Sequence, residues 1–372
     1  MGRFPENTME SPYSARLPSS LPRRENRGDA RSSGNGRWAA PRRSVAPTAS
    51  GPGPASMSFE HEPVMVNEIV ELLGEVPRGL YVDATLGGAG HAVALLERRD
   101  DMALIGIDRD PIARAAANER LGRFGERATI VAGRFDQIAE LVDAHRPDRP
   151  VTGVLFDLGV SSPQLDEAER GFSYRHEAPL DMRMNPDDPV SAADIVNSWT
   201  HEQLTHLLRD GGDERFASRI AGRIIDHRPI ATTTELAAIV VDAIPAATRR
   251  SGGHPAKRSF QALRIAVNDE LSQIPVALED TVDLLAPHGR CAVLSYHSGE
   301  DRLVKRAIAE AEAGGCTCPP RLPCACGAEP LVKIVPPRQR VATDDEQRRN
   351  PRSTSARLRC FERLGALSEA RG

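Results

Sequence analysis

A glycine-rich stretch, DATLGGAGH, runs from Asp83 to His91 and is the first place where the sequence indicates chemistry. Glycine lets a backbone adopt positive φ and approach a ligand closely. Asp108 ends the next apolar segment, about twenty residues further on, where an acid can accept hydrogen bonds from both hydroxyls of a ribose. The two features predict a site for a ribose-containing ligand. A tight turn without a ligand stays open as the alternative, because a glycine cluster alone is a weak signal.

Two ribose-containing ligands fit this spacing, a nicotinamide dinucleotide and S-adenosylmethionine (SAM). A dinucleotide site needs the pattern G-x-G-x-x-G, whose third glycine opens the helix against the pyrophosphate. From Gly88 the sequence reads GAGHAV, so the third glycine is missing. SAM has no pyrophosphate to bind, and the stretch therefore favours SAM.

The elements that must position these residues alternate between strand and helix. Four apolar segments predict buried strands, and helical patterns stand between them. In order the stretches are GLYVDATLGG, HAVALLERR, MALIGIDRD, PIARAAANERLGRF, ATIVAGRF, FDQIAELVDAH and VTGVLFDLGV. This alternation predicts an α/β fold with a doubly wound, Rossmann-like parallel sheet, whose ligand lies at the carboxyl ends of the strands.

After Val160 the alternation stops, and the sequence reads as helices and loops until PHGRCAVLSYHS supplies another strand. This pattern predicts an all-helical subdomain inserted into the sheet domain. A helix that begins at Lys257 is expected to lead back into the sheet. LVKIV and ARLRCFERL predict the last strands, with a basic polar loop between them. The expected divisions are a tail over residues 1–56, a first part of the sheet domain over 57–162, the helical insertion over 163–262 and a second part over 263–372.

The tail consists mainly of Pro, Ser, Gly and Arg without apolar periodicity, which predicts disorder. The whole chain has 48 basic and 52 acidic residues, of which the tail holds nine and four, so the remainder carries a net charge of −9. Such a body is no general polyanion binder, and contacts to nucleic acid require local basic patches. The sequence has no secretory signal and no uncharged run long enough to span a bilayer, which predicts a cytoplasmic protein.

Four blocks of sequence point to one family: HEPVMVNEIVELL, VLFDLGVSSPQLDEAERGFSYRHEAPLDMRM, SYHSGEDRLVKR and NPRSTSARLR. They closely resemble the MraW-type methyltransferases, bacterial enzymes that use SAM to methylate N4 of a cytidine in the decoding centre of 16S ribosomal RNA. The resemblance covers residues 59 to 364. One departure is Tyr296 with Gly299, where the family more often has Phe and Leu.

The resemblance implies a set of SAM contacts, each of which has a structural alternative. Phe135 is placed beside the adenine, but a lone aromatic after a strand is usually core. His91 could instead be a neighbour of a helix N-cap without contact to a ligand. Gln164 could instead be an ordinary loop residue. For Asp157 the structural alternative is weaker, because an acid that ends an apolar strand is unfavourable unless something pairs with it. The implied contacts are Ala89, Gly90, His91, Asp108, Phe135, Asp157 and Gln164.

The reaction implied is attack by an exocyclic amine on the methyl group. Methylation at C5 of cytosine would need a cysteine nucleophile near the fourth strand, and none lies between Asp157 and Gln164. Asp157 is the leading candidate to hold and deprotonate the amine, with Ser161, Ser162 and His297 as further candidates. The SSPQ loop has no aromatic residue to stack on the base. Phe172, Tyr174 and Tyr296 are the candidates for that role.

Two basic stretches are the expected phosphate contacts with the predicted partner, 16S rRNA in an assembled or nearly assembled small ribosomal subunit. Arg215, Arg219 and Arg223 recur at every fourth residue and would line one helix face, either as a further basic surface for RNA or, equally well, as an ordinary solvated face. The residues of the two basic stretches are Arg249, Arg250, Lys257 and Arg258, followed by Arg349, Arg352 and Arg357.

Four cysteines form a C-x-C-x5-C-x-C array within residues 316–326, namely Cys316, Cys318, Cys324 and Cys326. Four thiolates suit tetrahedral zinc, but a surface loop with reduced thiols is the favoured interpretation, because paired C-x-C is less typical of zinc sites than C-x2-C. Three functions remain in view: a SAM-dependent RNA methyltransferase, which the residues favour, a nicotinamide oxidoreductase, and a non-catalytic ribosome-binding protein that retains SAM.

Overall fold

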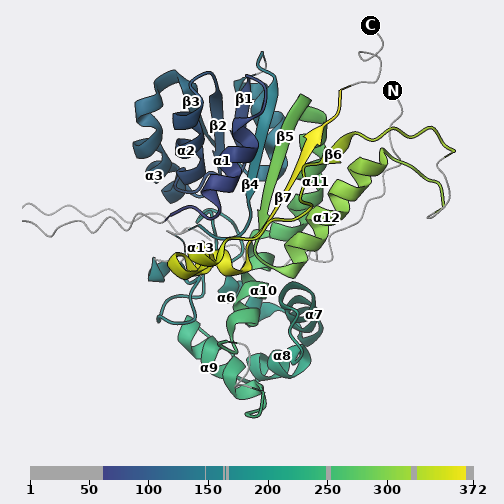
Figure 1. Cartoon of the computed structure of the whole chain (residues 1–372). Helices are drawn as coiled ribbons and strands as arrows, with labels where there is room; N and C mark the ends of the chain where they lie inside the picture. The colour runs from purple at the N-terminus through teal and green to yellow at the C-terminus, as the bar shows by residue number, and fades with distance from the viewer. Residues whose placement is uncertain are drawn as a thin grey trace, which may run out of the picture. The chain divides into compact units, whose positions relative to one another are not determined.

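The computed structural model describes residues 62–146, 148–161, 164, 167–248, 253–319 and 325–365. Within these residues the central feature is a seven-stranded sheet of order β3-β2-β1-β4-β5-β7-β6 (Figure 1). Its strands are β1 (Leu80–Asp83), β2 (Ala103–Asp108), β3 (Ala128–Ala132), β4 (Val151–Asp157), β5 (Leu285–Ser295), β6 (Val332–Ile334) and β7 (Arg357–Arg363).

The pairing of the strands places the switch point of the sheet at β1. This strand pairs in parallel with β2 on one side and with β4 on the other, so the chain order reverses here. The strands from β3 to β5 are parallel, whereas β7 runs antiparallel to β5 and β6 antiparallel to β7. Open α/β sheets bind ligands outside the carboxyl ends of the strands at such a point.

Helices cover both faces of the sheet. On β1 the side chains of Leu80 and Val82 pack into one buried cluster and Tyr81 into another, as the two-residue period of a strand requires. Helices α4, α11 and α12 cover the first face, and α1, α2 and α3 cover the second. These helices are α1 (Val66–Gly74), α2 (Gly90–Arg98), α3 (Pro111–Leu121), α4 (Ile138–His145), α11 (Glu270–Leu284) and α12 (Ser298–Ala313).

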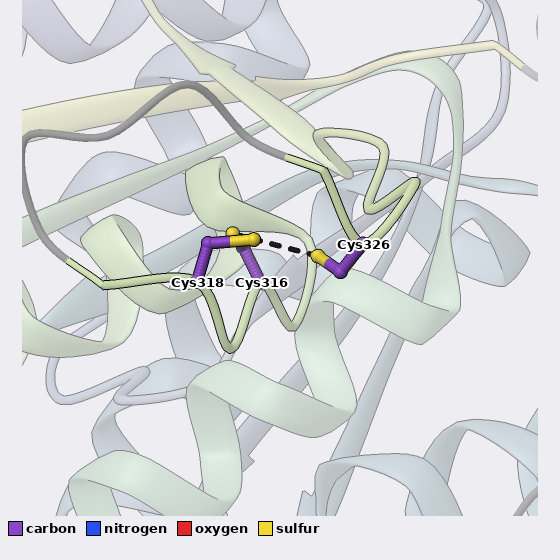
Figure 2. A group of neighbouring side chains, drawn as sticks. All are labelled: Cys316, Cys318 and Cys326. Carbon is purple, nitrogen blue, oxygen red and sulfur yellow. Dashed lines mark hydrogen bonds between the residues drawn. The ribbon is translucent and has the colours of Figure 1, made fainter.

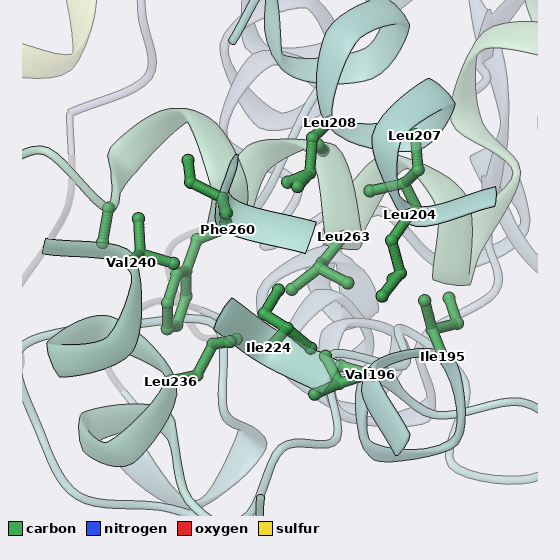
Figure 3. Packing of buried hydrophobic residues seen from close by; sticks show 14 of the residues in the cluster. Ile195, Val196, Leu204, Leu207, Leu208, Ile224, Leu236, Val240, Phe260 and Leu263 are labelled. Carbon is green, nitrogen blue, oxygen red and sulfur yellow. The ribbon is translucent and has the colours of Figure 1, made fainter. Parts of the chain in front are cut away.

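A separate group of helices forms its own hydrophobic core. Leu204, Ile224, Leu236 and Leu263, one from each of four helices, meet in this core (Figure 3). Side-chain capping boxes at Ser191, Thr200 and Thr232 begin three of the helices. The group comprises α6 (Ala192–Ser198), α7 (His201–Gly212), α8 (Ala217–Asp226), α9 (Thr233–Ala243) and α10 (Lys257–Asn268). The predicted fold class, a doubly wound sheet with an inserted helical subdomain, is confirmed.

Three local features differ from the sequence expectations. The helical stretch after Lys257 is divided at Asp269, whose φ of 51° separates α10 from α11. Arg215 precedes α8, so the prediction that it lines one helix face with Arg219 and Arg223 was wrong. A short helix, α13 (Asp344–Arg349), lies in the polar stretch before β7. None of the helices in the described ranges is long and apolar enough to cross a membrane.

Polar contacts join the helical subdomain to the strand ends of the sheet. Arg109, just after β2, donates to a carboxylate oxygen of Asp188 at 2.6 Å and to the carbonyl oxygen of Asn268 at 2.9 Å. Ser298 at the start of α12 donates to Asp213 at the end of α7 at 2.8 Å. These contacts place the helices beside the carboxyl ends of the strands.

Candidate cofactor and active site

The glycine turn connects β1 to α2 through two residues with left-handed backbones. Gly87 has φ 49°, and Ala89, the N-cap of α2, has φ 60°. A Cβ built on Gly90 would lie 2.3 Å from Cγ of Pro63, so only glycine fits there without movement of the proline. The turn therefore presents backbone rather than side chains at the switch point.

Asp108 at the end of β2 is tied directly to this turn. Its Oδ2 accepts a hydrogen bond from the backbone N–H of Gly87 at 2.8 Å, and its Oδ1 accepts one from the N–H of Asp110 at 2.8 Å. Desolvation raises the pKa of Asp108 from 3.8 to about 6, against the lowering effect of these hydrogen bonds. Each carboxylate oxygen still has a lone pair for a further donor.

Asp83 at the end of β1 is a second buried carboxylate beside the turn, and it is 1% exposed. It accepts hydrogen bonds from the N–H of Thr85 at 3.3 Å and the hydroxyl of Tyr81 at 3.4 Å, both long. Burial first, and then the negative charges of Asp157 and Asp108, raise its pKa from 3.8 to about 7. Within the described part of the chain, neither Asp83 nor Asp108 forms an ion pair with a basic side chain.

Asp157 at the end of β4 completes a group of three acids on neighbouring strands. Its Oδ1 accepts a hydrogen bond from the Tyr296 hydroxyl at 2.6 Å. Its Oδ2 lies 3.7 Å from Nδ1 of His91, whose Nε2 donates to the carbonyl oxygen of Val64 at 2.9 Å. Desolvation raises the pKa of Asp157, while His91 and the hydrogen bond from Tyr296 oppose that rise. Asp157 is thus held by one oxygen, with the other beside His91.

In the loop after β4, the predicted site residues Ser161 and Gln164 contact each other, and Gln164 connects the loop to Asp110. The N–H of Ser161 donates to Oε1 of Gln164 at 3.0 Å, and Nε2 of Gln164 donates to Asp110 at 2.9 Å. The Ser161 hydroxyl is screened from solvent and has no hydrogen-bond partner among the described residues. A Cβ built on Gly87 would lie 3.8 Å from that of Ser161, so this hydroxyl lies beside the glycine turn. Ser162 lies outside the described residues.

His297 is engaged in capping a helix rather than left open beside Asp157. Its Nδ1 accepts hydrogen bonds from the N–H groups of Gly299 at 3.2 Å and Glu300 at 3.4 Å. Its Nε2 lies 3.1 Å from Oε1 of Glu300. Nδ1 of His297 therefore caps α12, whereas its Nε2 is buried beside Glu300 and makes no hydrogen bond of good geometry among the described residues.

The three aromatic candidates occupy different places. Phe172 packs in the helical core, and Tyr174 stacks on His254 with ring centroids 4.4 Å apart. Tyr296 alone of the three contacts Asp157. This contact arises because Asp157 pairs with Leu294 across the neighbouring parallel strands β4 and β5, which brings the residues just after Leu294 close to Asp157. The sequence alone does not show that these two strands are neighbours.

Phe135 follows β3 and lies at the edge of the sheet core. Its ring meets that of Phe156 edge to face, with centroids 5.9 Å apart and planes at 83°. It is partly buried against the core cluster of that face. The position is compatible with a role beside an adenine and also with simple packing.

Comparison with known proteins bears directly on this site. The sequence pattern of the MraW methylase family matches residues 58–364. The chain belongs to the MraW methylase family. The predicted resemblance is thereby confirmed, and membership in a family of methylases supports SAM as the cofactor over a nicotinamide dinucleotide.

Individual relatives show how far the similarity extends. The chain is 49% identical to the ribosomal RNA small subunit methyltransferase H of Heliobacterium mobile over 313 residues, which are 83% of this chain and 100% of the relative. The protein of the same name from Geobacter sulfurreducens is also 49% identical, with the same coverage. That of Mycobacterium sp. (strain KMS) is 45% identical over 96% of this chain and 95% of its own length.

Several basic residues predicted to bind RNA are exposed in this family member. Lys257 and Arg258 lie exposed at the start of α10. Arg349 pairs with Glu62 at 3.1 Å, and Arg357 pairs with Asp301 at 3.2 Å. Arg352 lies half-buried in the short 3-10 helix that follows α13. Arg249 and Arg250 lie outside the described residues.

A polar pocket of about 290 Å³ opens beside Tyr296. Its wall joins the end of β5 to the segment that leads into β7, and it includes Ser298, Thr354, Ser355 and Arg357. The pocket therefore places hydroxyl groups and one guanidinium next to the tyrosine that holds Asp157.

Proposed function

We propose that this chain transfers a methyl group from SAM to the exocyclic N4 of a cytidine in the decoding centre of 16S rRNA. The single observation that carries the cofactor assignment is the group Asp83, Asp108 and Asp157 at the carboxyl ends of three neighbouring strands. Desolvation raises the pKa of all three. Among the described residues, Asp83 and Asp108 form no ion pair with a basic side chain, and Asp157 has only His91 beside it. Buried carboxylates with so little compensating charge favour a ligand that brings positive charge. SAM carries a sulfonium and an ammonium group.

The surroundings of the glycine turn fit the parts of this cofactor. Asp108, already held by two backbone N–H groups, has lone pairs for the ribose hydroxyls. The backbone from Ala89 to His91 suits the polar methionine end, and beside it lies the Ser161 hydroxyl, which has no hydrogen-bond partner among the described residues. Phe135 is the aromatic residue available for the adenine. When bound, the cofactor supplies an electrophilic methyl group on a charged leaving group.

Asp157 is proposed to act on the amine of the cytidine. The nitrogen lone pair is delocalised into the ring, so an acceptor that holds one amino hydrogen helps the nitrogen to become tetrahedral. As the new N–C bond forms and the S–C bond breaks, the amino proton passes to Oδ2 of Asp157. Tyr296 keeps Oδ1 in place through its hydroxyl, whose pKa burial raises well above its ordinary value, so it remains a donor.

The RNA substrate is supported by the names of the relatives and by the basic side chains near the site. The Heliobacterium relative is named a ribosomal RNA small subunit methyltransferase. The polar pocket beside Tyr296 contains Arg357 and hydroxyl groups that suit the phosphate and sugar of a nucleotide next to the target. A cytidine must leave its stack for the amine to reach the methyl group.

Methyl transfer from labelled SAM to naked 16S RNA and to purified small subunits tests the proposal. The modified nucleoside is then mapped by digestion and mass spectrometry. We expect label on N4 of one decoding-centre cytidine, with assembled or nearly assembled subunits as the better substrate. Label at C5 or on another nucleoside would contradict the assignment.

A parallel titration separates the two rival functions. Quenching of nicotinamide fluorescence by the chain, without binding of SAM, would support an oxidoreductase. Tight SAM binding without turnover on either RNA substrate would support a non-catalytic ribosome-binding protein.

A further inference from the structure

The cysteine loop, residues 316–326, lies between the end of α12 and the start of β6 and has no part in the proposed methyl transfer. Helix α12 ends at Gly314 and Gly315, whose φ values of 58° and 75° turn the chain sharply. The N–H of Cys316 then donates to the carbonyl oxygen of Ala313 at 3.1 Å. The first cysteine of the loop is therefore held by the helix end.

The two stems of the loop contact each other. The N–H of Leu331, just before β6, donates to the carbonyl oxygen of Ala311 in α12 at 3.0 Å. A Cβ built on Gly314 would lie only 1.8 Å from the carbonyl oxygen of Glu329, so the two backbones touch there. Because both stems are joined at their base, the cysteines at the two ends of the loop face each other.

Three thiols come together at this point. The sulfur atoms of Cys316, Cys318 and Cys326 all lie within 4.8 Å of one another (Figure 2). The Sγ atoms of Cys316 and Cys326 are 3.6 Å apart. The N–H of Ala325 donates to Sγ of Cys318 at 3.3 Å, which is the type of contact that stabilises a thiolate.

These spacings match a tetrahedral thiolate site. With Zn–S bonds of about 2.3 Å, two sulfur ligands on one zinc ion lie about 3.8 Å apart. The 3.6 Å separation of Cys316 and Cys326 is close to that value and well above the length of about 2.05 Å for an S–S bond. The Sγ atom of Cys318 lies within 4.8 Å of the other two sulfur atoms, so all three are near the separations that a shared ion requires.

We propose that Cys316, Cys318 and Cys326 bind one zinc ion through their thiolates. Each thiol gives up its proton on binding, and a further ligand fills the fourth position. Cys324, the remaining cysteine of the array, lies outside the described residues, and the proposal rests on the other three. The ion fastens the end of α12 to the start of β6, at a distance from Asp157. Its role is structural.

Metal analysis of the full chain tests this site without reference to activity. The protein is purified in reducing buffer and dialysed against a weak chelator. Its zinc content is then measured by inductively coupled plasma mass spectrometry. We expect about one zinc ion per chain. Replacement of the zinc by Co²⁺ should give the sulfur-to-cobalt charge-transfer absorption and the intense visible d–d bands of a tetrahedral thiolate site.

Matched variants assign the ion to its ligands. Cys316→Ser and Cys318→Ser should each lose most of the bound zinc and the cobalt spectrum. Thr317→Ser, between these two cysteines, and Cys291→Ala, which removes a buried thiol from β5, should retain both. Circular dichroism of every variant reports whether it has folded.

Three results would overturn the proposal. The first is wild-type protein that contains no zinc and gives no cobalt spectrum. The second is zinc that survives in the variant with all three cysteines replaced. The third is an intact mass, under non-reducing conditions, that shows a disulfide within the loop of the freshly isolated protein. The cobalt spectrum of the wild-type chain keeps the test valid even if a serine variant does not fold.

Discussion

Acidic side chains occur in two settings in this molecule, and the difference lies in their partners. At the carboxyl ends of β1 and β2, Asp83 and Asp108 are bound by N–H and hydroxyl donors, and their pKa values are raised to about 7 and about 6. Near β7, Asp301 and Glu362 are surrounded by basic side chains, and their pKa values are lowered.

Asp301 is an acid whose negative charge is compensated by basic side chains. Asp301 accepts hydrogen bonds from Arg359 at 2.7 Å and from Arg357 at 3.2 Å. Burial alone would raise its pKa, but the two arginines outweigh that effect. Asp83 and Asp108 at the switch point have no such arginine pair among the described residues, and we interpret them as part of a site for a cationic ligand.

Replacement of Asp157 by Asn should have the largest effect on function. The amide retains the size and one acceptor oxygen but cannot accept the amino proton, so turnover should fall by roughly 10²-fold or more. SAM affinity should change less than turnover. Single-turnover methylation with saturating SAM and small subunits, together with a binding titration, measures both quantities.

Tyr296→Phe is the matched control for Asp157→Asn, because it removes only the hydroxyl that holds the carboxylate and should lower turnover by about tenfold. If Asp157→Asn greatly weakens SAM binding while the rate at saturating SAM stays near that of the parent, Asp157 is a cofactor ligand only. The amine would then have to be oriented by the loop around Ser161.

Asp108→Ala should weaken SAM binding by about 1.5–3 kcal/mol, as expected for hydrogen bonds to a charged group. Calorimetry on the purified variant measures the loss. Asp101→Ala, which removes the half-buried acid paired with Arg99 just before β2, is the control and should leave the affinity unchanged. An unchanged affinity in Asp108→Ala would show that this acid is not at the ribose.

Asp301→Asn tests the paired group. It should lower the free energy of unfolding at pH 7 by about 1–3 kcal/mol, because two arginines lose their charged partner. Denaturant unfolding measures this loss. The pKa of Asp301 is depressed on folding, so its contribution is present above the ordinary value of 3.8 and is lost as the pH falls below it. If Asp301→Asn instead lost much of its SAM affinity, the arginine-paired acids near β7 would not differ in function from the acids at the switch point.

Asp83→Asn should have the smallest effect, and of opposite sign. The pKa of Asp83 rises from 3.8 to about 7 on folding, so the folded chain binds more protons between these values and its stability falls as the pH rises through them. Without this group that loss of stability should be absent, so the variant should be more stable than the parent at pH 8 in the absence of SAM. Thermal unfolding from pH 5 to pH 8 compares the two slopes. If the melting temperatures of the parent and of Asp83→Asn change with pH at the same slope, Asp83 does not titrate as described.

Much of the fold followed from local pattern. The alternation of apolar strands and helices predicted the doubly wound sheet, and the loss of that alternation after Val160 predicted the helical insertion, because strand and helix periods are readable over short windows. The break at Asp269 was missed, since both sides of it have helical periodicity and only the left-handed backbone of one residue separates them. Arg215 was misplaced for a similar reason, because helix ends are weakly encoded.

By itself, the sequence determined the strand order along the chain, the acids that end β1, β2 and β4, the glycine turn and the family. Only the tertiary structure decided which of these side chains have partners. The Tyr296 hydroxyl on Asp157, the capping of α12 by His297 and the closeness of the cysteine sulfurs all join residues that local periodicity leaves unrelated. Such contacts depend on how strand ends and loop stems meet in space, and burial then sets the charge state of each group.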